Sequence, residues 1–312
     1  MKFVMVGNFD VDYTSETHHA NTLEQLGHSV VRLREAKTPA ERIYQLATES
    51  DGLIWIHTHS WHTQGAAEVL QRLKAKGIPT LTYHLDLWLG LARQKDLDND
   101  PFYKHIGWFF TVDKLMADWF NENTEVKGRY LMAGVYEPEC YIDNSTGNRR
   151  KVIFVGSKGY HPEWPYRAKL IEYLEACYYG NFTHVGGDGT MATTRGAALN
   201  KLYARTKVTV GDSLNIGFKY PYYSSDRFFE SMGRGAFLIY PKIKGFAEDF
   251  IDKQHVVYYE HGNLADLREK IDYYLEHDEE REQIRWAGHL LVKEKHTYTN
   301  RWQTILKEVF NV

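Results

Sequence analysis

Residues 226–240 decide the fold of this chain, and they read Asp-Arg-Phe-Phe-Glu-Ser-Met-Gly-Arg-Gly-Ala-Phe-Leu-Ile-Tyr. A short helical pattern carries Glu230 and stops at Gly233 and Gly235, and an apolar run typical of a buried strand follows at once. A carboxylate and the cation Arg227 therefore stand beside a glycine-rich turn at a strand end, where open α/β sheets bind ligands. This pattern suits a sugar nucleotide, because a carboxylate accepts hydrogen bonds from ribose hydroxyls and an arginine pairs with a diphosphate.

Outward from this stretch, the chain reads as two successive series of strands and helices. The first series predicts strands at residues 2–7, 29–33, 52–57, 80–84, 108–112 and 129–131, and helices at 15–26, 64–75 and 114–121. It also predicts a helix that opens with Thr38 as its cap and Pro39 at its first helical position. The second predicts strands at residues 151–156, 181–185, 207–210, 236–240 and 255–259, helices at 167–176, 199–205 and 227–232, and helix almost throughout 264–310. Strands alternating with helices of this length indicate parallel sheets with right-handed crossovers. The polar residues 143–150 between the series predict a linker.

Composition and charge limit the classes of protein that the chain can belong to. The 312 residues are 43% hydrophobic and 25% charged, which is ordinary for globular domains. Residues 1–148 hold 14 Lys and Arg against 20 Asp and Glu, and the rest of the chain holds 24 against 21. The basic second half favours an anionic substrate. The acidic first half disfavours nucleic acid, which is normally bound by clustered cations.

Targeting and redox signals point to an ordinary cytoplasmic protein. No apolar run approaches the roughly 20 residues that span a bilayer, and residues 1–7 are too short an apolar run for a signal peptide. Cys140 and Cys177 form neither a metal-binding spacing nor a disulfide framework. We therefore expect a cytoplasmic protein without a membrane span, and the sequence leaves its oligomeric state open.

Several segments of the second half resemble the C-terminal domain of GT-B glycosyltransferases, most of all the spore-maturation-like group. They are residues 226–240, Phe154-Val155-Gly156-Ser157 with the later Arg167, Phe246-Ala247-Glu248-Asp249-Phe250, Val256-Val257-Tyr258-Tyr259, and His296-Thr297-Tyr298-Thr299-Asn300-Arg301-Trp302. The resemblance implies an α/β fold with two Rossmann-like domains facing across a cleft. It implies an acceptor-binding domain at 1–148, a nucleotide-sugar-binding domain at 149–295, and a C-terminal helix at 296–312 that crosses back to the first domain.

The resemblance also assigns residues to the donor. It aligns Glu230 with the second carboxylate of the Glu-x7-Glu pattern that holds the nucleotide ribose, but Tyr222 stands at the first position. Retention or inversion of the sugar's configuration is therefore open. Arg227 and Lys158 are candidates for neutralising the diphosphate, a role that commonly replaces a metal in this fold.

Glycine-rich turns in the second half add further donor candidates. Gly156 and Ser157 follow a predicted strand, and Asp188 lies in the turn Gly186–Gly189. The alternative is that the glycines only form tight turns and that Asp188 bonds its own backbone.

The first half supplies candidates for acceptor chemistry. Glu16 and His19 are three residues apart at a helix start, so both can lie on one helix face. A carboxylate or imidazole with a pKa near neutrality is the expected base for an acceptor hydroxyl. The alternative is that Ser15 caps the helix and Glu16 only complements the helix dipole.

Polar and aromatic residues also follow two predicted strands of the first half. They are His57, His59 and Trp61 after one strand, and His84, Asp86 and Trp88 after another. They favour an acceptor pocket with tryptophan stacking faces over a metal site, and His84 with Asp86 is the second candidate for the base. Asp10 with Asp12, and Asp96 with Asp98, resemble the metal-binding carboxylate pairs of the other major glycosyltransferase fold, which differs from the fold predicted for this chain. The first pair follows the first strand, and the second lies in Lys95–Asp100, which we interpret as a solvated loop.

The leading hypothesis is a metal-independent glycosyltransferase that moves a sugar from a nucleoside-diphosphate sugar, most simply a UDP-sugar, to an acceptor hydroxyl. No cofactor is expected. The acceptor can be a glycan, a small molecule or a modified nucleic acid. The alternatives are a transferase acting on a hydroxymethylated base in DNA, a sugar-nucleotide epimerase, and a non-catalytic sugar-binding protein of the same fold.

Overall fold

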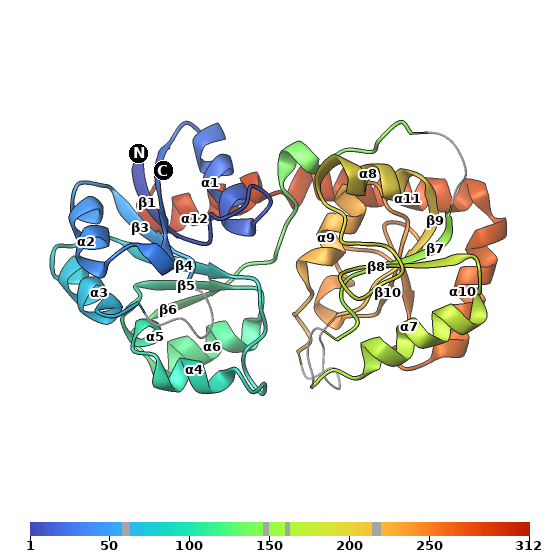
Figure 1. The fold of residues 1–312 in the computed structure, drawn as a ribbon, viewed down its shortest axis with the longest axis horizontal. Coiled ribbons are helices and arrows are strands. Elements are labelled where there is room, and N and C mark those ends of the chain that lie inside the picture. Colours follow the sequence, from blue (N-terminus) through green and yellow to red (C-terminus); the bar gives the residue numbers. More distant parts are fainter. Residues whose placement is uncertain (58–62, 146–149, 160–162, 214–219) are drawn as a thin grey trace. The chain divides into compact units, whose positions relative to one another are not determined.

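The computed structural model describes residues 1–57, 63–145, 150–159, 163–213 and 220–312, and these fall into two compact units. The first unit is Met1–Met132 with Tyr298–Val312, and the second is Ala133–Thr297. The sequence predicted the boundary at residue 148, but the second unit already begins at Ala133, because Glu139 pairs with Arg234 and accepts from Asn200 of that unit. Each unit is built around its own parallel sheet, as the alternating strand and helix patterns predicted (Figure 1).

A six-stranded parallel sheet forms the centre of the first unit, in the order β2-β1-β3-β4-β5-β6. The strands are β1 (Lys2–Gly7), β2 (Ser29–Arg34), β3 (Gly52–Trp55), β4 (Thr80–His84), β5 (Trp108–Thr111) and β6 (Lys127–Tyr130). The helices are α1 (Ser15–Gln25), the short η1 (Glu35–Lys37), α2 (Ala40–Thr48), α3 (Ala66–Ala75), α4 (Gln94–Asn99), α5 (Phe102–His105), α6 (Lys114–Asn123) and α12 (Tyr298–Phe310).

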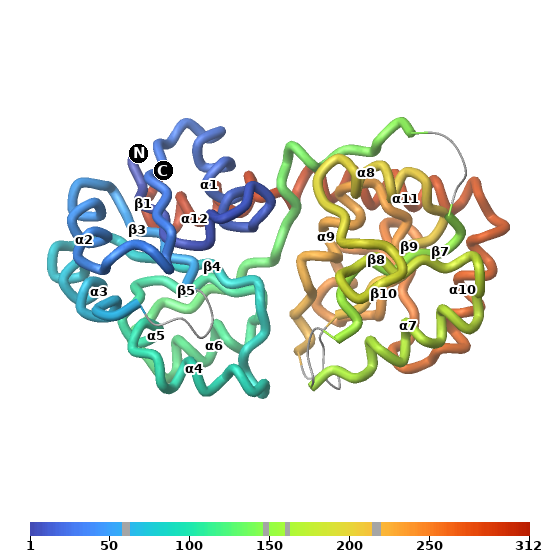
Figure 2. Tube along the Cα trace, in the orientation of Figure 1, coloured from blue at the N-terminus to red at the C-terminus, as the bar shows by residue number. Residues whose placement is uncertain are grey.

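Helices cover both faces of this sheet. Val4 and Val6 of β1 belong to a core cluster with residues of α2, α3 and α6. Phe3 of the same strand packs edge-on against Phe310 of α12, with ring centroids 5.1 Å apart. Burial on both faces explains why β1 is apolar at every position between Lys2 and Gly7. The two ends of the chain therefore lie side by side in the first unit (Figure 2).

A five-stranded parallel sheet forms the centre of the second unit, in the order β11-β10-β9-β7-β8. The strands are β7 (Arg150–Val155), β8 (Phe182–Val185), β9 (Thr206–Val210), β10 (Leu238–Pro241) and β11 (Val257–Tyr259). The helices are the short η2 (Glu137–Glu139), α7 (Tyr166–Cys177), α8 (Gly196–Ala204), α9 (Asp226–Gly233), the short η4 (Lys244–Phe246), α10 (Leu264–Glu276) and α11 (Asp278–Lys295).

Side chains of α11 satisfy the backbone where α9 ends. Carbonyl groups at a helix C-terminus have no partner within the helix. Arg285 Nε donates a hydrogen bond to the carbonyl oxygen of Gly235 at 2.5 Å. His289 Nδ1 lies 2.9 Å from the carbonyl oxygen of Gly233. The glycine turn between α9 and β10 is therefore held by tertiary contacts as well as by its own backbone.

Three local predictions differ from the structure. Thr14, not Ser15, caps α1, because its hydroxyl accepts from the backbone N–H of Thr17 at 3.2 Å. Pro39, not Thr38, occupies the N-cap position of α2. The expected solvated loop at residues 95–100 is mostly α4, and it leads into a buried Asp100.

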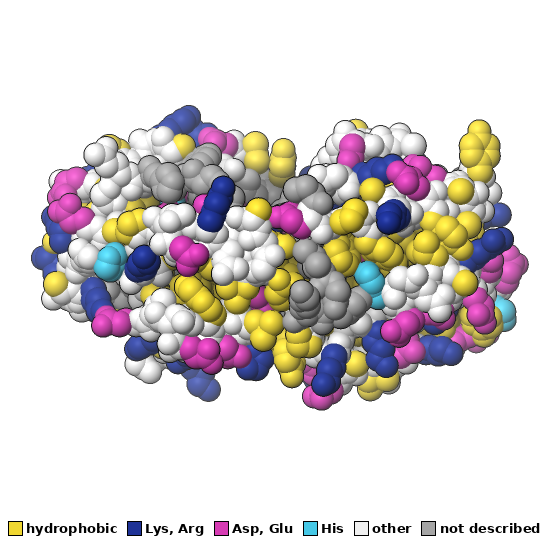
Figure 3. Space-filling view, turned by 90° about the horizontal axis from the view of Figure 1, so that it is seen from below, with side chains coloured by type: hydrophobic (Ala, Val, Ile, Leu, Met, Phe, Trp, Pro, Cys, Tyr) yellow, Lys and Arg dark blue, Asp and Glu magenta, His cyan; other side chains and the backbone are white. Residues whose placement is uncertain are grey.

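The surface seen in Figure 3 mixes charges of both signs. Among the described side chains on this face, Lys and Arg are interspersed with Asp and Glu and do not form a continuous stripe. No helix in the described parts of the chain combines the length and the apolar character that crossing a membrane requires.

Candidate functional site

Strand order fixes where each unit can bind a ligand. In the first sheet β1 lies between β2 and β3, so the connections that leave β1 and β3 diverge to opposite sides. In the second sheet β7 lies between β8 and β9 in the same way. Ligands bind outside the carboxyl ends of the strands at such switch points.

The first unit has a cavity of about 210 Å³ at this position. The residues that line it follow β1, β3 and β4, and they are Ser15, Glu16, His19, Ile56, His57, Tyr83, His84, Leu85, Asp86 and Trp88. Every described residue that the sequence proposed for the base or the acceptor pocket is among them. His59 and Trp61, the other two pocket candidates, lie outside the described residues.

Glu16 enters the cavity from the first turn of α1. Ser15 Oγ donates a hydrogen bond to Glu16 Oε2 at 3.0 Å. Burial raises the pKa of Glu16, and the negative charge of Glu35 raises it further. Hydrogen bonds from its own backbone N–H and from Ser15 oppose this rise. Gly7 leaves room for this side chain, because a Cβ atom there would lie 2.8 Å from Glu16 Cγ. Glu16 is thus a carboxylate with a pKa moved toward neutrality, as a general base requires.

His19 is completely buried, and its role follows from its tautomer. Trp302 Nε1 donates a hydrogen bond to His19 Nδ1 at 3.1 Å, so the ring carries its proton on Nε2. Burial lowers the pKa of His19 to about 3, and the charge of His18 acts in the same direction. A neutral ring in this tautomer donates a hydrogen bond at Nε2. Of the two residues that the sequence proposed as the base, Glu16 therefore remains a candidate proton acceptor, whereas the described contacts of His19 do not suit that role.

His57 lies between two carboxylates that the sequence did not single out. Its Nδ1 contacts Glu35 Oε1, and its Nε2 lies 2.8 Å from Asp100 Oδ2. Burial disfavours the charged ring, but bonds to Asp100 and Glu35, together with their charges, raise the pKa of His57 to about 9. Trp55 Nε1 also donates to Glu35 Oε1 at 2.8 Å. His57 is therefore a buried imidazolium with both nitrogens engaged, and it forms part of the cavity wall.

The remaining candidates in this wall differ in exposure. His84 is stacked on Phe109, with ring centroids 5.2 Å apart. Trp88 is only 1% exposed, so it forms wall and not the open stacking face that was expected. The Asp86 carboxylate is 44% exposed, and Arg93 NH1 lies 3.3 Å from it. Among the described residues, no three His, Cys, Asp or Glu side chains gather as metal ligands do.

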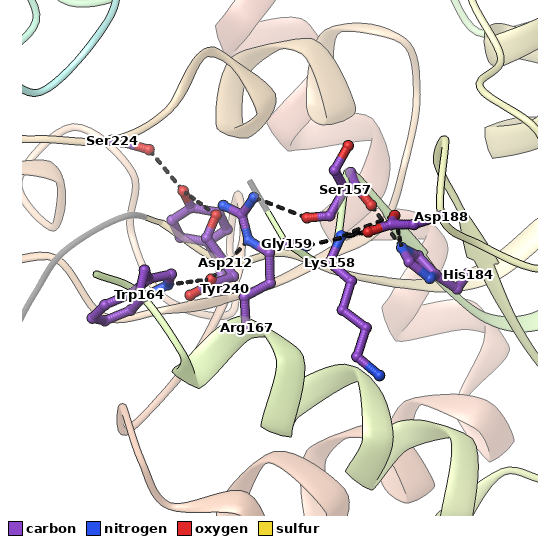
Figure 4. Close-up of polar contacts among 11 residues, drawn as sticks. Ser157, Lys158, Gly159, Trp164, Arg167, His184, Asp188, Asp212, Ser224 and Tyr240 are labelled. Atoms are coloured by element: carbon purple, nitrogen blue, oxygen red, sulfur yellow. Dashed lines mark hydrogen bonds and ion pairs between the residues drawn. The ribbon is translucent and has the colours of Figure 1, made fainter. Parts of the chain in front are cut away.

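In the second unit, the loop after β7 is held from the side. The Asp188 carboxylate accepts hydrogen bonds from the backbone N–H groups of Lys158 at 2.9 Å and Gly159 at 3.2 Å. The ring of His184 lies 2.7 Å from the carbonyl oxygen of Gly156, which has a φ of +148° (Figure 4). Asp188 therefore holds the loop after β7 in place, in addition to any bond within its own turn. Lys158 Nζ lies 2.8 Å from Glu172, so its charge is already paired.

A buried carboxylate after β9 orients an arginine beside this loop. Asp212 Oδ2 accepts from Trp164 Nε1 at 2.7 Å and from Arg167 Nε at 3.2 Å (Figure 4). Burial raises the pKa of Asp212, and the charge of Arg167 and these two bonds oppose it. Arg167 NH1 also donates to the carbonyl of Ser157 at 3.4 Å. Sequence reasoning missed Asp212 and Trp164, although Gly211-Asp212-Ser213 directly after a buried strand was the available signal.

The start of α9 is tied to the same strand ends. Ser224 Oγ lies 3.0 Å from Tyr240 OH, which donates to the carbonyl of Asp212 at 3.3 Å (Figure 4). On the helix itself, Glu230 Oε2 lies 3.1 Å from Arg227 NH1. The Glu230 side chain is 18% exposed, so it is not part of a solvated helix face.

Ion pairs keep both charges of α9 in place. Burial alone would lower the pKa of Arg227, but the charges of Glu230 and Asp226 reverse the direction and keep the guanidinium protonated. Glu230 Oε1 also lies 3.7 Å from Arg234 NH2. Tyr222, where the first carboxylate of the pattern would stand, is 37% exposed and packs over Gly245.

Known proteins resemble this chain in sequence over its second half and in fold over its whole length. A family model described as glycosyl transferase-like matches residues 148–307. An α-glucosyltransferase in complex with UDP-glucose and DNA containing an abasic site is 10% identical, with a TM-score of 0.71 and 99% of each chain covered. Anabaena HepE in complex with UDP-glucose is 13% identical, with a TM-score of 0.69 and 100% of each chain covered.

Sucrose-phosphate synthase from Thermosynechococcus elongatus is similar at 10% identity, with a TM-score of 0.67 and 100% of each chain covered. No curated protein sequence matches the chain. At these identities the likeness to solved structures shows the fold, which is the GT-B arrangement of two parallel α/β units predicted from the sequence.

Proposed function

The chain belongs to the glycosyl transferase-like family, and from this premise we propose that it transfers a sugar from a UDP-sugar to an acceptor hydroxyl without a metal ion. The second unit would bind the donor at the switch point of its sheet, and the first unit would bind the acceptor at its own. The resemblance to the spore-maturation-like group is part of this proposal.

The observation that carries the proposal is the orientation of Arg167. Asp212 holds the Nε side of its guanidinium, and NH1 reaches the loop Gly156–Gly159. A guanidinium fixed in this way can pair with a diphosphate at the carboxyl end of β7. It would also stabilise the negative charge that develops on departing UDP. The UDP-glucose in the complexes of Anabaena HepE and the α-glucosyltransferase supports a donor of this class.

Arg227 and Glu230 would complete the donor site from α9. Glu230 can accept a hydrogen bond from a ribose hydroxyl, and Arg227 adds a second positive charge. Lys158 is the weaker candidate for the diphosphate, because Glu172 already holds its ammonium group. Since Tyr222 replaces the first carboxylate of the pattern, the proposal covers transfer of the sugar and not its stereochemical course.

Glu16 would act as the base in the first unit. It would take the proton from the acceptor hydroxyl, whose oxygen then bonds to the anomeric carbon of the sugar. The bond from that carbon to the diphosphate breaks, and UDP leaves with the electron pair. This step needs no further reactant, and a positioned base typically contributes about 10²- to 10⁴-fold to such a rate.

The experiment measures UDP binding and UDP release. Wild type should bind UDP in calorimetry and release UDP from UDP-glucose, with the rate unchanged in EDTA. Arg167→Ala should weaken UDP binding about 10- to 100-fold, because a charged hydrogen bond contributes roughly 1.5–3 kcal/mol. Lys169→Ala, an exposed cation on the same helix, is the matched control and should bind UDP normally.

Three results would count against the proposal. They are an absence of UDP binding by wild type, equal binding by Arg167→Ala, and loss of activity in EDTA. Product analysis separates a transferase from an epimerase, because an epimerase changes the sugar nucleotide without releasing UDP.

A further inference from the structure

The cavity of the first unit has an unusual charge balance. Its lining residues include the carboxylates Glu16 and Asp86 and three histidines, but none of these described residues is Lys or Arg. Behind the wall, Glu35 and Asp100 flank the ring of His57, so two negative charges surround one positive charge. Arg93 lies close enough to offset the charge of Asp86. An occupant of the cavity therefore meets a net negative environment.

A second, independent feature of the wall calls for a ligand oxygen. His19 is 0% exposed, and its Nε2 has no hydrogen-bond partner among the described residues. Because Trp302 fixes the proton on Nε2, this atom is a donor. A buried donor without a partner is unfavourable. A hydroxyl oxygen of an occupant can accept from it, whereas a cation cannot.

The size of the cavity limits the occupant. A volume of about 210 Å³ is below the roughly 300–1,000 Å³ of sites that enclose drug-sized ligands. The described walls therefore accommodate one ring with its hydroxyl groups, and a longer acceptor would place only its terminal unit there.

We propose that this cavity is an acceptor subsite selective for an uncharged, polyhydroxylated unit the size of one sugar ring, and that its carboxylates exclude phosphorylated acceptors. The proposal rests on the proposed transferase function and names the acceptor class for it. One hydroxyl accepts from His19 Nε2, and the reacting hydroxyl gives its proton to Glu16. A wall carboxylate and a ligand phosphate about 6 Å apart, at an effective dielectric constant of about 20, repel each other enough to weaken binding of the phosphorylated sugar on the order of a hundredfold.

The test uses matched sugars that differ only by a phosphate, namely glucose with glucose 6-phosphate and mannose with mannose 6-phosphate. Ligand-observed NMR measures their binding to the full chain without donor, and UDP release from UDP-glucose measures transfer. At least one neutral sugar should bind and accelerate UDP release, and its phosphorylated partner should do so on the order of a hundredfold less well. Glu16→Gln should keep neutral-sugar binding and lose the acceleration by about 10²-fold or more.

A charge variant tests the cause of the discrimination. Asp86→Asn removes one negative charge from the wall and leaves Arg93 in place, so the phosphorylated sugar should bind on the order of tenfold more tightly. Neutral-sugar binding should change far less, because an uncharged ligand carries no net charge for this carboxylate to repel. Asp98→Asn, the same substitution at an exposed position of α4, is the control and should leave both sugars unaffected.

The outcomes separate the two proposals. Phosphorylated sugars that bind as well as neutral ones, or neutral sugars that all fail to bind, overturn the acceptor inference even where UDP binding is intact. Absence of UDP binding overturns the proposed function. Neutral-sugar binding that discriminates against phosphate still supports the cavity's selectivity in that case.

Discussion

Two histidines of the first unit, His19 and His57, are held in opposite protonation states by their surroundings. His19 lies among the rings of Tyr83, Tyr298 and Trp302, so burial keeps it neutral. His57 is equally inaccessible, but the carboxylates beside it keep it charged. Burial therefore does not decide the charge of a histidine by itself, and the partner groups do.

The charge of His57 predicts that the first unit loses stability in mild alkali. The pKa of His57 is raised from 6.5 to about 9, so its stabilising contribution is complete below pH 6.5 and is lost as pH rises through 9. The full contribution is on the order of 3 kcal/mol. Hydrogen exchange of first-unit peptides should therefore quicken between pH 7 and 9.5, after correction for intrinsic rates.

Two variants check this assignment. His57→Gln leaves Glu35 and Asp100 buried without the cation, so it should destabilise the unit by about 3–5 kcal/mol and abolish the fall in stability between pH 7 and 9.5. His105→Gln, on α5 of the same unit, should keep the wild-type profile. A wild-type stability that is flat across this range would contradict the charged assignment of His57.

At the scale of elements, α12 completes the first unit although it is the last helix of the chain. Trp302 bonds His19 on α1, and Phe310 packs on Phe3 of β1. The ring of Phe310 also lies where Gly52 has no side chain, since a Cβ there would be 2.7 Å from it. The helix thus contributes both to the core of the unit and to the tautomer of a cavity residue.

Substitutions at Trp302 should separate these two contributions. Trp302→Phe keeps most of the packing and removes the donor to His19, so it should cost about 1 kcal/mol. Trp302→Ala also leaves a cavity and should cost about 3–5 kcal/mol. Hydrogen exchange in peptides of α1 and β1 measures both, and peptides of β7 and β9 are the internal control. Equal acceleration in both units would contradict a role confined to the first unit.

Elements could be predicted from the sequence where local physics determines them, and contacts between distant residues could not. Buried parallel strands are apolar runs, so β1 and β9 were found within a residue or two. Glu35 and Asp100 lie 22 and 43 positions from His57, and no local pattern links them. Asp212 likewise meets Arg167 only through the strand order.

The candidate site was predictable to the extent that it follows strand ends. Residues after β1, β3 and β4 were proposed because parallel strands bring their carboxyl ends to one edge, and they do line one cavity. Their individual roles were not predictable. The tautomer of His19 depends on Trp302, which is 283 positions away, and the charge of His57 depends on the buried carboxylates.

At the scale of the whole molecule, the same strand pattern presents two candidate sites of different charge. Both sheets place a switch point beside their first strand, but the described lining of the first unit's cavity carries Glu16 and Asp86 without Lys or Arg, whereas the second unit holds Arg167 beside the loop after β7. A diphosphate and an uncharged sugar are the ligands that such a division favours. From these local charges we expect the two switch points to bind different substrates.

This division predicts separate footprints in hydrogen exchange. UDP at 100 times its Kd should slow exchange up to about 100-fold at amides whose exchange requires the donor site to open. The affected peptides should contain residues 156–159, 211–213 and 224–227, whereas a bound neutral sugar should protect residues 8–19 and 84–88. Arg167→Ala at the same UDP concentration should lose most of the first footprint and keep the second. A UDP footprint confined to residues 8–19 and 84–88 would place the donor in the first unit and contradict the prediction.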